Sequence, residues 1–273
     1  MRKITLIAML LGVIMLAGCT GDDPSGPGGT LADVTNFAVS ATSAGTSVVL
    51  TWTAVASNGT DAIDGYKIYF NEDAATFVEG DLVGTIPDGT TTYTHAASSA
   101  GYYGIIAYEG DNTSENYATT DDLPNMISSA YTIWNNHAPA TSHSGFIFGM
   151  TSGTTCLASS GNHDMYCYDG GQGNLTWLYS GDYGTFGDGN NTNFYEHASS
   201  FASPGSGPWN PPAGPMVVGD VIFAELYDGY WAKIYVIALP HYTGGTDNAY
   251  GIEFYYDIQP IQGLELFTTA SQP

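Results

Sequence analysis

Short segments in which hydrophobic and polar residues alternate begin near residue 31 and recur through most of the chain. Between Ser47 and Thr53, the residues Val48, Leu50 and Trp52 fall on one face of the segment. A period of two residues is typical of β-strands that bury one face. Clusters of Gly, Asn, Asp and Ser separate the segments and predict turns. We therefore expect an all-β protein, and the length of 273 residues suggests two domains.

Four motifs between residues 31 and 135 follow one another in a distinctive order: Leu50-Thr51-Trp52, Gly65–Tyr69, Tyr93–His95 and Tyr103–Ala107. They resemble strands B, C, E and F of a fibronectin type III domain. The resemblance implies a β-sandwich over residues 31–135, with an insertion at 116–125 and a last strand at 127–134. Gly101 departs from the family, since many members have a tyrosine at the corresponding corner. The chain has no Arg-Gly-Asp sequence, so integrin-type adhesion is not supported.

Residues 136–273 contain a second set of alternating segments, separated by longer loops. A hairpin is clearest at 217–237, where Asp228-Gly229 supplies the positive φ angles of a tight turn. Residues 180–215 are rich in Gly, Asn and Pro and predict a long irregular region. The hairpin and the later Phe254-Tyr255-Tyr256 are similar to the C-terminal half of a group of uncharacterised bacterial lipoproteins and to HmuY-type surface lipoproteins. That resemblance implies a second antiparallel β domain with long loops, and haem as a ligand by analogy.

The N-terminal segment has the pattern of an export signal. Two basic residues precede an apolar run that is too short for a comfortable membrane span and ends in small residues. The run closes with Leu16-Ala17-Gly18-Cys19, which resembles the lipobox of bacterial lipoproteins. The resemblance implies that residues 1–18 are removed and that Cys19 carries the lipid anchor. Residues 19–30 are rich in Gly, Pro, Ser and Asp and predict a flexible linker.

The residues after the lipobox favour the outer membrane as the location. Thr20 occupies the position at which many Gram-negative lipoproteins carry the aspartate that retains them in the inner membrane. Asp22 and Asp23 are placed like the acidic export signal of surface-exposed lipoproteins, although an acidic linker has the same composition. Both a periplasm-facing and a surface-exposed orientation therefore stay open.

The charge balance is strongly acidic. The chain has 27 acidic residues and 4 basic ones, and the mature form keeps only Lys67 and Lys233 of the bases. Nucleic acid binding is excluded by this balance, since phosphates are held chiefly by Lys and Arg. The same charge raises the local concentration of cations such as calcium.

Two cysteines remain after Cys19, and they are separated by about ten residues. In an exported protein, Cys156 and Cys167 are expected to form one disulfide, with two free thiols as the alternative.

Several residues offer ligand chemistry. Asp188, Asn190 and Thr192 place oxygen atoms at alternate positions, as calcium prefers, but the later glutamate of an EF-hand loop is absent and an ordinary turn is the alternative. Asp121-Asp122 is a weaker candidate of the same kind. His197 and Trp209, in the long irregular region, are candidate ligand-binding residues, and Trp209 offers a face for glycan stacking. No histidine spacing favours a haem or zinc site.

The sequence contains no recognised catalytic motif: there is no Gly-x-Ser-x-Gly elbow, no His-Glu-x-x-His helix and no phosphate loop. We therefore expect a non-enzymatic, membrane-anchored surface lipoprotein that binds a protein or glycan at the cell surface. Capture of a small ligand, haem or glycan, by the C-terminal domain is the alternative, and an unrecognised hydrolase is a third.

Overall fold

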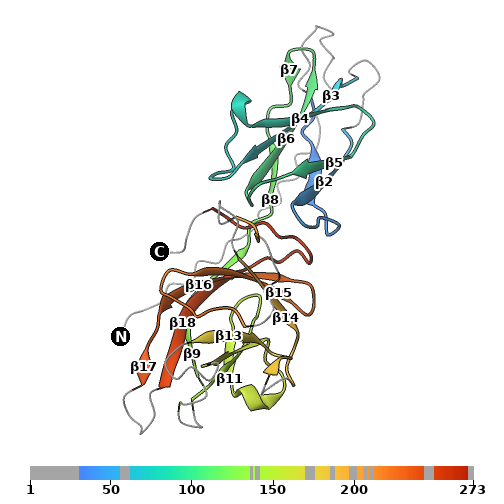
Figure 1. Cartoon of the computed structure of the whole chain (residues 1–273). Coiled ribbons are helices and arrows are strands. Elements are labelled where there is room, and N and C mark those ends of the chain that lie inside the picture. Colours follow the sequence, from blue (N-terminus) through green and yellow to red (C-terminus); the bar gives the residue numbers. More distant parts are fainter. Residues whose placement is uncertain are drawn as a thin grey trace, which may run out of the picture.

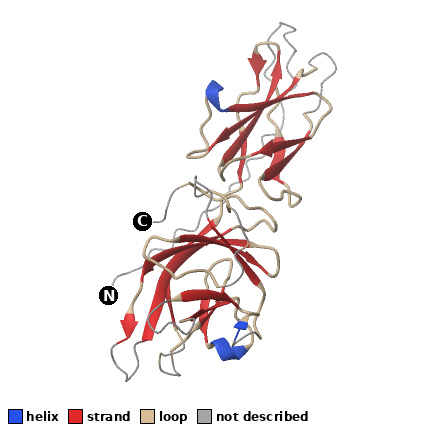
Figure 2. Cartoon of the chain, in the orientation of Figure 1, coloured by secondary structure: helices blue, strands red, loops and turns tan. Residues whose placement is uncertain are grey.

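The computed structural model confirms the all-β fold class: the part of the chain that it describes has antiparallel sheets and, as helical elements, only short turns (Figure 2). It describes residues 31–55, 62–135, 138, 142–169, 176–184, 188–196, 202–205, 208, 212–242 and 249–269. Two β-sandwiches are stacked end to end, and the chain passes from one to the other after β8 (Ala118–Asp121) (Figure 1). We call them the first and the second sandwich. No helix among the described residues is long and apolar enough to cross a membrane.

The first sandwich has a three-stranded and a five-stranded sheet. The smaller sheet has the order β1 (Thr35–Val39), β2 (Ser47–Thr53) and β5 (Thr92–Ala96). The larger sheet has the order β4 (Leu82–Pro87), β3 (Gly65–Asn71) and β6 (Tyr102–Glu109), with β7 (Asn112–Thr113) and β8 both pairing with β6. A short 3₁₀ turn, η1 (Glu79–Asp81), precedes β4.

The core of the first sandwich follows the predicted alternation. Val48, Leu50 and Trp52 of β2 are buried against Tyr66 and Ile68 of β3, across the two sheets. The rings of Trp52 and Tyr66 meet edge to face at 5.3 Å. Burial of this alternating face is what holds the two sheets together.

The far edge of the larger sheet differs from the sequence prediction. Residues 116–125, interpreted as an insertion, contain β8, which pairs with β6 and completes the sheet. The predicted last strand is instead part of β9 (Asn125–Trp134), which pairs with β18 (Ala249–Ile258) of the second sandwich. β9 therefore belongs to a sheet of the second sandwich, although its residues precede the predicted domain boundary at residue 135.

The second sandwich packs a six-stranded sheet on a four-stranded sheet. The larger sheet has the order β14 (Thr192–Glu196), β15 (Val221–Leu226), β16 (Trp231–Ala238) and β18, with β17 (His241–Tyr242) and β9 both pairing with β18. The smaller sheet has the order β11 (Thr154–Cys156), β10 (Gly145–Ile147), β12 (Met165–Tyr168) and β13 (Trp177–Ser180). The 3₁₀ turn η2 (Ala158–Ser160) follows β11. The predicted hairpin is β15–β16, with Gly229 at φ 82° in its tip.

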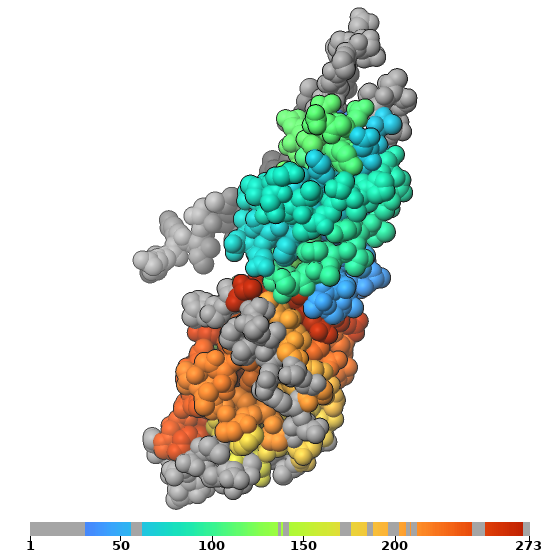
Figure 3. All heavy atoms as spheres, turned by 45° about the horizontal axis from the view of Figure 1, so that its top comes forward, coloured from blue at the N-terminus to red at the C-terminus, as the bar shows by residue number. Residues whose placement is uncertain are grey.

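The two sandwiches share a connection that the sequence prediction did not contain. After β18 the chain runs back to the first sandwich, and we call residues 261–267 the C-terminal strap. Leu264 and Leu266 of the strap are fully buried in the core of the first sandwich. Figure 3 shows this C-terminal part, in red, at the waist of the molecule beside the blue residues of the first sandwich.

Backbone hydrogen bonds hold the strap in place. The Gly45 N–H donates to the Gly263 carbonyl (2.7 Å), and the Glu265 N–H donates to the Gly45 carbonyl (2.8 Å). The Ala100 N–H donates to the Phe267 carbonyl (3.0 Å). Because the strap supplies core residues to the first sandwich, the two sandwiches are not independent structural units.

Candidate functional site

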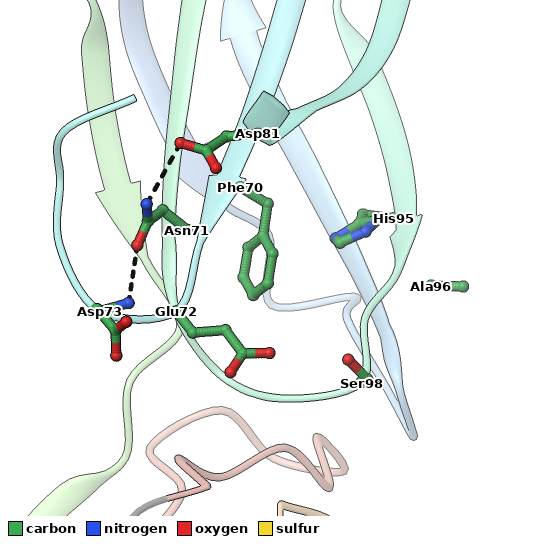
Figure 4. Close-up of a pocket in the computed structure, with 8 residues that line it drawn as sticks. All are labelled: Phe70, Asn71, Glu72, Asp73, Asp81, His95, Ala96 and Ser98. Carbon is green, nitrogen blue, oxygen red and sulfur yellow. Dashed lines mark hydrogen bonds between the residues drawn. The ribbon is translucent and has the colours of Figure 1, made fainter. Parts of the chain in front are cut away.

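A hollow of about 430 Å³ lies at the end of the first sandwich nearest the strap (Figure 4). Its wall comes from the ends of β3 and β5, which belong to opposite sheets, and from the loop after β3. The residues that line it are Phe70, Asn71, Glu72, Asp73, Asp81, His95, Ala96 and Ser98. Concave surfaces with a few convergent polar groups are the usual places for ligands, so we take this hollow as the candidate site.

Asn71 shapes one wall of the hollow. Its Oδ1 accepts hydrogen bonds from the N–H groups of Asp73 (2.9 Å) and Ala74 (3.1 Å), which turns the chain away from β3. Its Nδ2 donates to Asp81 Oδ2 (3.3 Å), and the same carboxylate oxygen accepts from the Val78 N–H (2.9 Å). The loop between β3 and β4 is thus folded around one amide and one carboxylate.

The apolar part of the hollow is an aromatic cluster. The Phe70 ring lies 5.1 Å from the His95 ring and 4.9 Å from the Tyr103 ring, measured between centroids. His95 Nδ1 and the Tyr103 hydroxyl are hydrogen-bonded at 3.1 Å. Burial lowers the pKa of His95, so its ring is neutral at neutral pH.

The hollow has negative charge without a positive partner in its lining. Glu72, Asp73 and Asp81 contribute carboxylates, and neither Lys67 nor Lys233 lines it. Lys67 lies over the Tyr108 ring, 5.4 Å from its centroid, and Lys233 is fully buried in the second sandwich. The other two basic residues of the chain, Arg2 and Lys3, lie outside the described residues, so among the described residues no Lys or Arg side chain lines the hollow.

The predicted calcium ligands lie elsewhere, in the second sandwich. Asp188 and Asn190 precede β14, and Thr192 is its first residue. Asn190 Nδ2 donates a hydrogen bond to Asp164 Oδ1 (2.8 Å). The group of Asn190 that faces this carboxylate is therefore its N–H donor and not the oxygen that would bind calcium. Thr192 is buried, and its N–H donates to Ser180 Oγ (2.8 Å). The described residues contain no group of three or more His, Cys, Asp or Glu side chains that could hold a metal ion.

The structure places three histidines of the second sandwich on separate elements. His143 precedes β10 and is hydrogen-bonded to Thr155 Oγ1 (2.8 Å), while His163 is buried before β12. His241 begins β17 and its ring stacks on Tyr250 at 4.6 Å. The predicted ligand residues His197 and Trp209, and the predicted lipid-bearing Cys19, lie outside the described residues.

The predicted disulfide is not formed, because both cysteines are free. Cys156 of β11 and Cys167 of β12 lie on opposite sides of β10, which pairs with both strands. Two strand spacings amount to about 9–10 Å, whereas bridged cysteines have Cα atoms within about 7 Å. Gly145 of β10 is opposite Cys156 and also opposite Tyr166, so Cys167 points to the other face of the sheet.

The hollow could not be predicted from the sequence, because the residues that line it are distant along the chain. The only local signal is the acidic and turn-forming segment after Phe70, which is also typical of an ordinary loop. The contribution of His95 and Ser98 depends on how the two sheets pack, and no spacing in the sequence encodes that.

No family model matches this sequence, and a search of curated protein sequences finds no match. Among solved structures, one titled "Titin kinase and its flanking domains" aligns over 83% of this chain with 11% sequence identity and a TM-score of 0.29. The alignment covers 37% of the length of that chain. A similarity at this TM-score carries no argument about function.

Proposed function

We propose that this chain is a non-enzymatic, lipid-anchored binding protein of the bacterial outer membrane, and that the hollow of the first sandwich receives a positively charged group of a partner. The observation that carries this proposal is the lining of the hollow, with three carboxylates, the Phe70 ring and no Lys or Arg. The lipobox-like Leu16–Cys19 supports the anchor, which places the hollow in the cell envelope.

The chemistry of the lining selects by charge. An ammonium or guanidinium group can donate to the carboxylates of Glu72 and Asp73 while it lies against the Phe70 ring. Anionic ligands are repelled, and haem carries two propionates that would meet the same carboxylates. The hollow therefore favours a basic segment of a surface protein over haem or nucleic acid.

A peptide titration tests this proposal. We expect hexa-arginine to bind the full chain and to shift the NMR signals of the hollow, with an affinity that falls as salt is raised. Asp73→Asn should weaken binding by about 2- to 5-fold, as expected for one exposed charge contact. Asp88→Asn removes the same charge from an exposed turn outside the hollow and is the matched control. Equal losses in the two variants would mean that the peptide senses only the net charge.

A neutral glycan is a second candidate, because the Phe70 ring lies beside carboxylate and amide groups that can bond sugar hydroxyls. Binding of this kind is distinguished by its insensitivity to salt. Phe70→Ala should abolish it, while Asp88→Asn should leave it unchanged.

A further inference from the structure

Residues 96–101, which are the last residue of β5 and the loop after it, touch the hollow, the strap and a buried carboxyl group. Ala96 and Ser98 line the hollow, and Ser99 Oγ donates to Glu72 Oε1 (2.5 Å). Ala100 donates its N–H to the strap at Phe267, and Gly101 donates its N–H to Asp122 Oδ1 (2.7 Å). Four successive residues, 98–101, therefore join the hydrogen bond at Asp122 to the wall of the hollow.

Asp122 lies at the junction of the two sandwiches, directly after β8. It is 2% exposed, and its Oδ2 is buried with no hydrogen-bond partner among the described residues. Its own N–H donates to the Gly101 carbonyl (3.2 Å), and its carbonyl accepts from Gln259 Nε2 (3.1 Å). Gln259 Nε2 also donates to the Leu266 carbonyl of the strap (2.8 Å). Asp122 thus holds the loop from one side and is joined to the strap on the other.

The charged and titratable groups near Asp122 named below provide no positive charge that would stabilise its ionised carboxylate. Burial is the main cause that raises the pKa of Asp122, and the carboxylate of its exposed neighbour Asp121 raises it further. Tyr103 of β6 is buried, and its pKa is raised by burial and then by the charge of Asp122. His95 is hydrogen-bonded to Tyr103, and burial lowers its pKa, so its ring is neutral at neutral pH. An ionised Asp122 would therefore have one oxygen bonded to Gly101 and the other buried without a hydrogen-bond partner among the described residues.

We infer that Asp122 is a pH-sensitive latch, which holds the 96–101 loop and the strap closed while it is protonated and releases them when it ionises. Its effect on the hollow rests on the proposed function, but the latch itself is a property of the junction. Release of the loop withdraws Ala96, Ser98 and the Ser99–Glu72 bond from the wall of the hollow, so ligand binding weakens as the latch opens.

The direction of the pH dependence follows from the proton balance. Burial raises the pKa of Asp122 to about 7 in the closed state; the hydrogen bond from the Gly101 N–H opposes part of this rise, and the charge of Asp121 adds to it. In an open, solvated state the pKa returns to about 3.9. Between these values the closed state holds a proton that the open state lacks, so closing is favoured less as pH rises. The opening constant should increase up to about tenfold per pH unit between about pH 4 and 7, and then level off.

Hydrogen exchange of the full chain tests the latch without any ligand. After correction for intrinsic chemistry, the amides of Ala100 and Gly101 should exchange about tenfold faster at pH 6.5 than at pH 5.5, with no further rise above pH 7.5. Asp122→Asn should remove this dependence, because an amide can still accept from Gly101 but cannot ionise. Asp121→Asn, which removes a neighbouring exposed charge, should keep the slope. A pH-independent exchange in the wild-type chain would overturn the latch.

A second measurement, on the wild-type chain, tests the latch even if the Asp122→Asn variant fails to fold. In the wild-type chain labelled with ¹³C at aspartate carboxyls, one resonance should titrate near neutral pH, and its absence would also overturn the latch. Glu265 of the strap has a pKa raised by burial and by Glu225, so Glu265→Gln separates its contribution. Neither measurement uses a ligand. If they show the latch but hexa-arginine does not bind the chain, the proposed function is wrong and the latch stands.

Discussion

Leu266→Ala provides the sharpest test of the architecture. Leu266 follows the last strand of the second sandwich, yet its side chain is fully buried in the core of the first. Truncation of a buried leucine to alanine costs about 2–5 kcal/mol, which includes the cavity that is left. The site is at the end of a core between two sheets, so we expect a loss of about 3 kcal/mol in the stability of the first sandwich.

The loss should appear far from the substitution in sequence. Hydrogen exchange under mild denaturant should show faster opening of β2, β3 and β6, while β15 and β16 keep more of their protection. A loss of about 3 kcal/mol corresponds to a decrease in melting temperature of about 10 °C or more for a sandwich of this size. Trp52, buried in the core of the first sandwich, gives a fluorescence signal for the same transition.

The matched control is Leu157→Ala, the same truncation at a side chain that is 42% exposed. It should change stability by no more than about 0.5 kcal/mol, as surface substitutions generally do. Equal effects of the two variants, or destabilisation confined to the second sandwich, would refute the role of the strap in the first core.

Three other substitutions or treatments test separate features of the chain. Alkylation in denaturant without a reductant should modify both Cys156 and Cys167, and recovery of a peptide pair linked through them would contradict the free thiols. Lys233 is fully buried, and burial lowers its pKa to about 8, so the wild-type chain should gain stability as pH rises from about 8 to 10.5. Lys233→Met should lack that gain. At pH 7 the variant should be as stable as the wild type or more stable, since an apolar side chain avoids the desolvation of a buried ammonium. If its stability depends on pH as that of the wild type does, Lys233 is not the cause of the gain. Cys19→Ser should release the protein from the membrane fraction, and continued membrane retention would contradict the lipid anchor.

Local patterns in the sequence determined the fold class and most strand positions. Val48, Leu50 and Trp52 were assigned to one face because side chains alternate along a strand, and all three are buried. Asp228-Gly229 predicted the position of the β15–β16 hairpin, and in the structure Gly229 alone of the pair takes the positive φ angle that the turn needs. These features depend on neighbours within a few residues, so the sequence by itself contains them.

Tertiary structure alone decided which strands pair and what closes each core. An alternating pattern identifies the buried face of β9 but not its partner, and the partner is β18, more than one hundred residues later. Cys156 and Cys167 are close in sequence but are separated by β10, so sheet order prevented their disulfide. Leu266 and Asp122 acquire their roles only at the junction, where packing of two sandwiches removes both from water. Burial depends on contacts between distant segments, and it is burial that turns an ordinary aspartate after a strand into a group that can respond to pH.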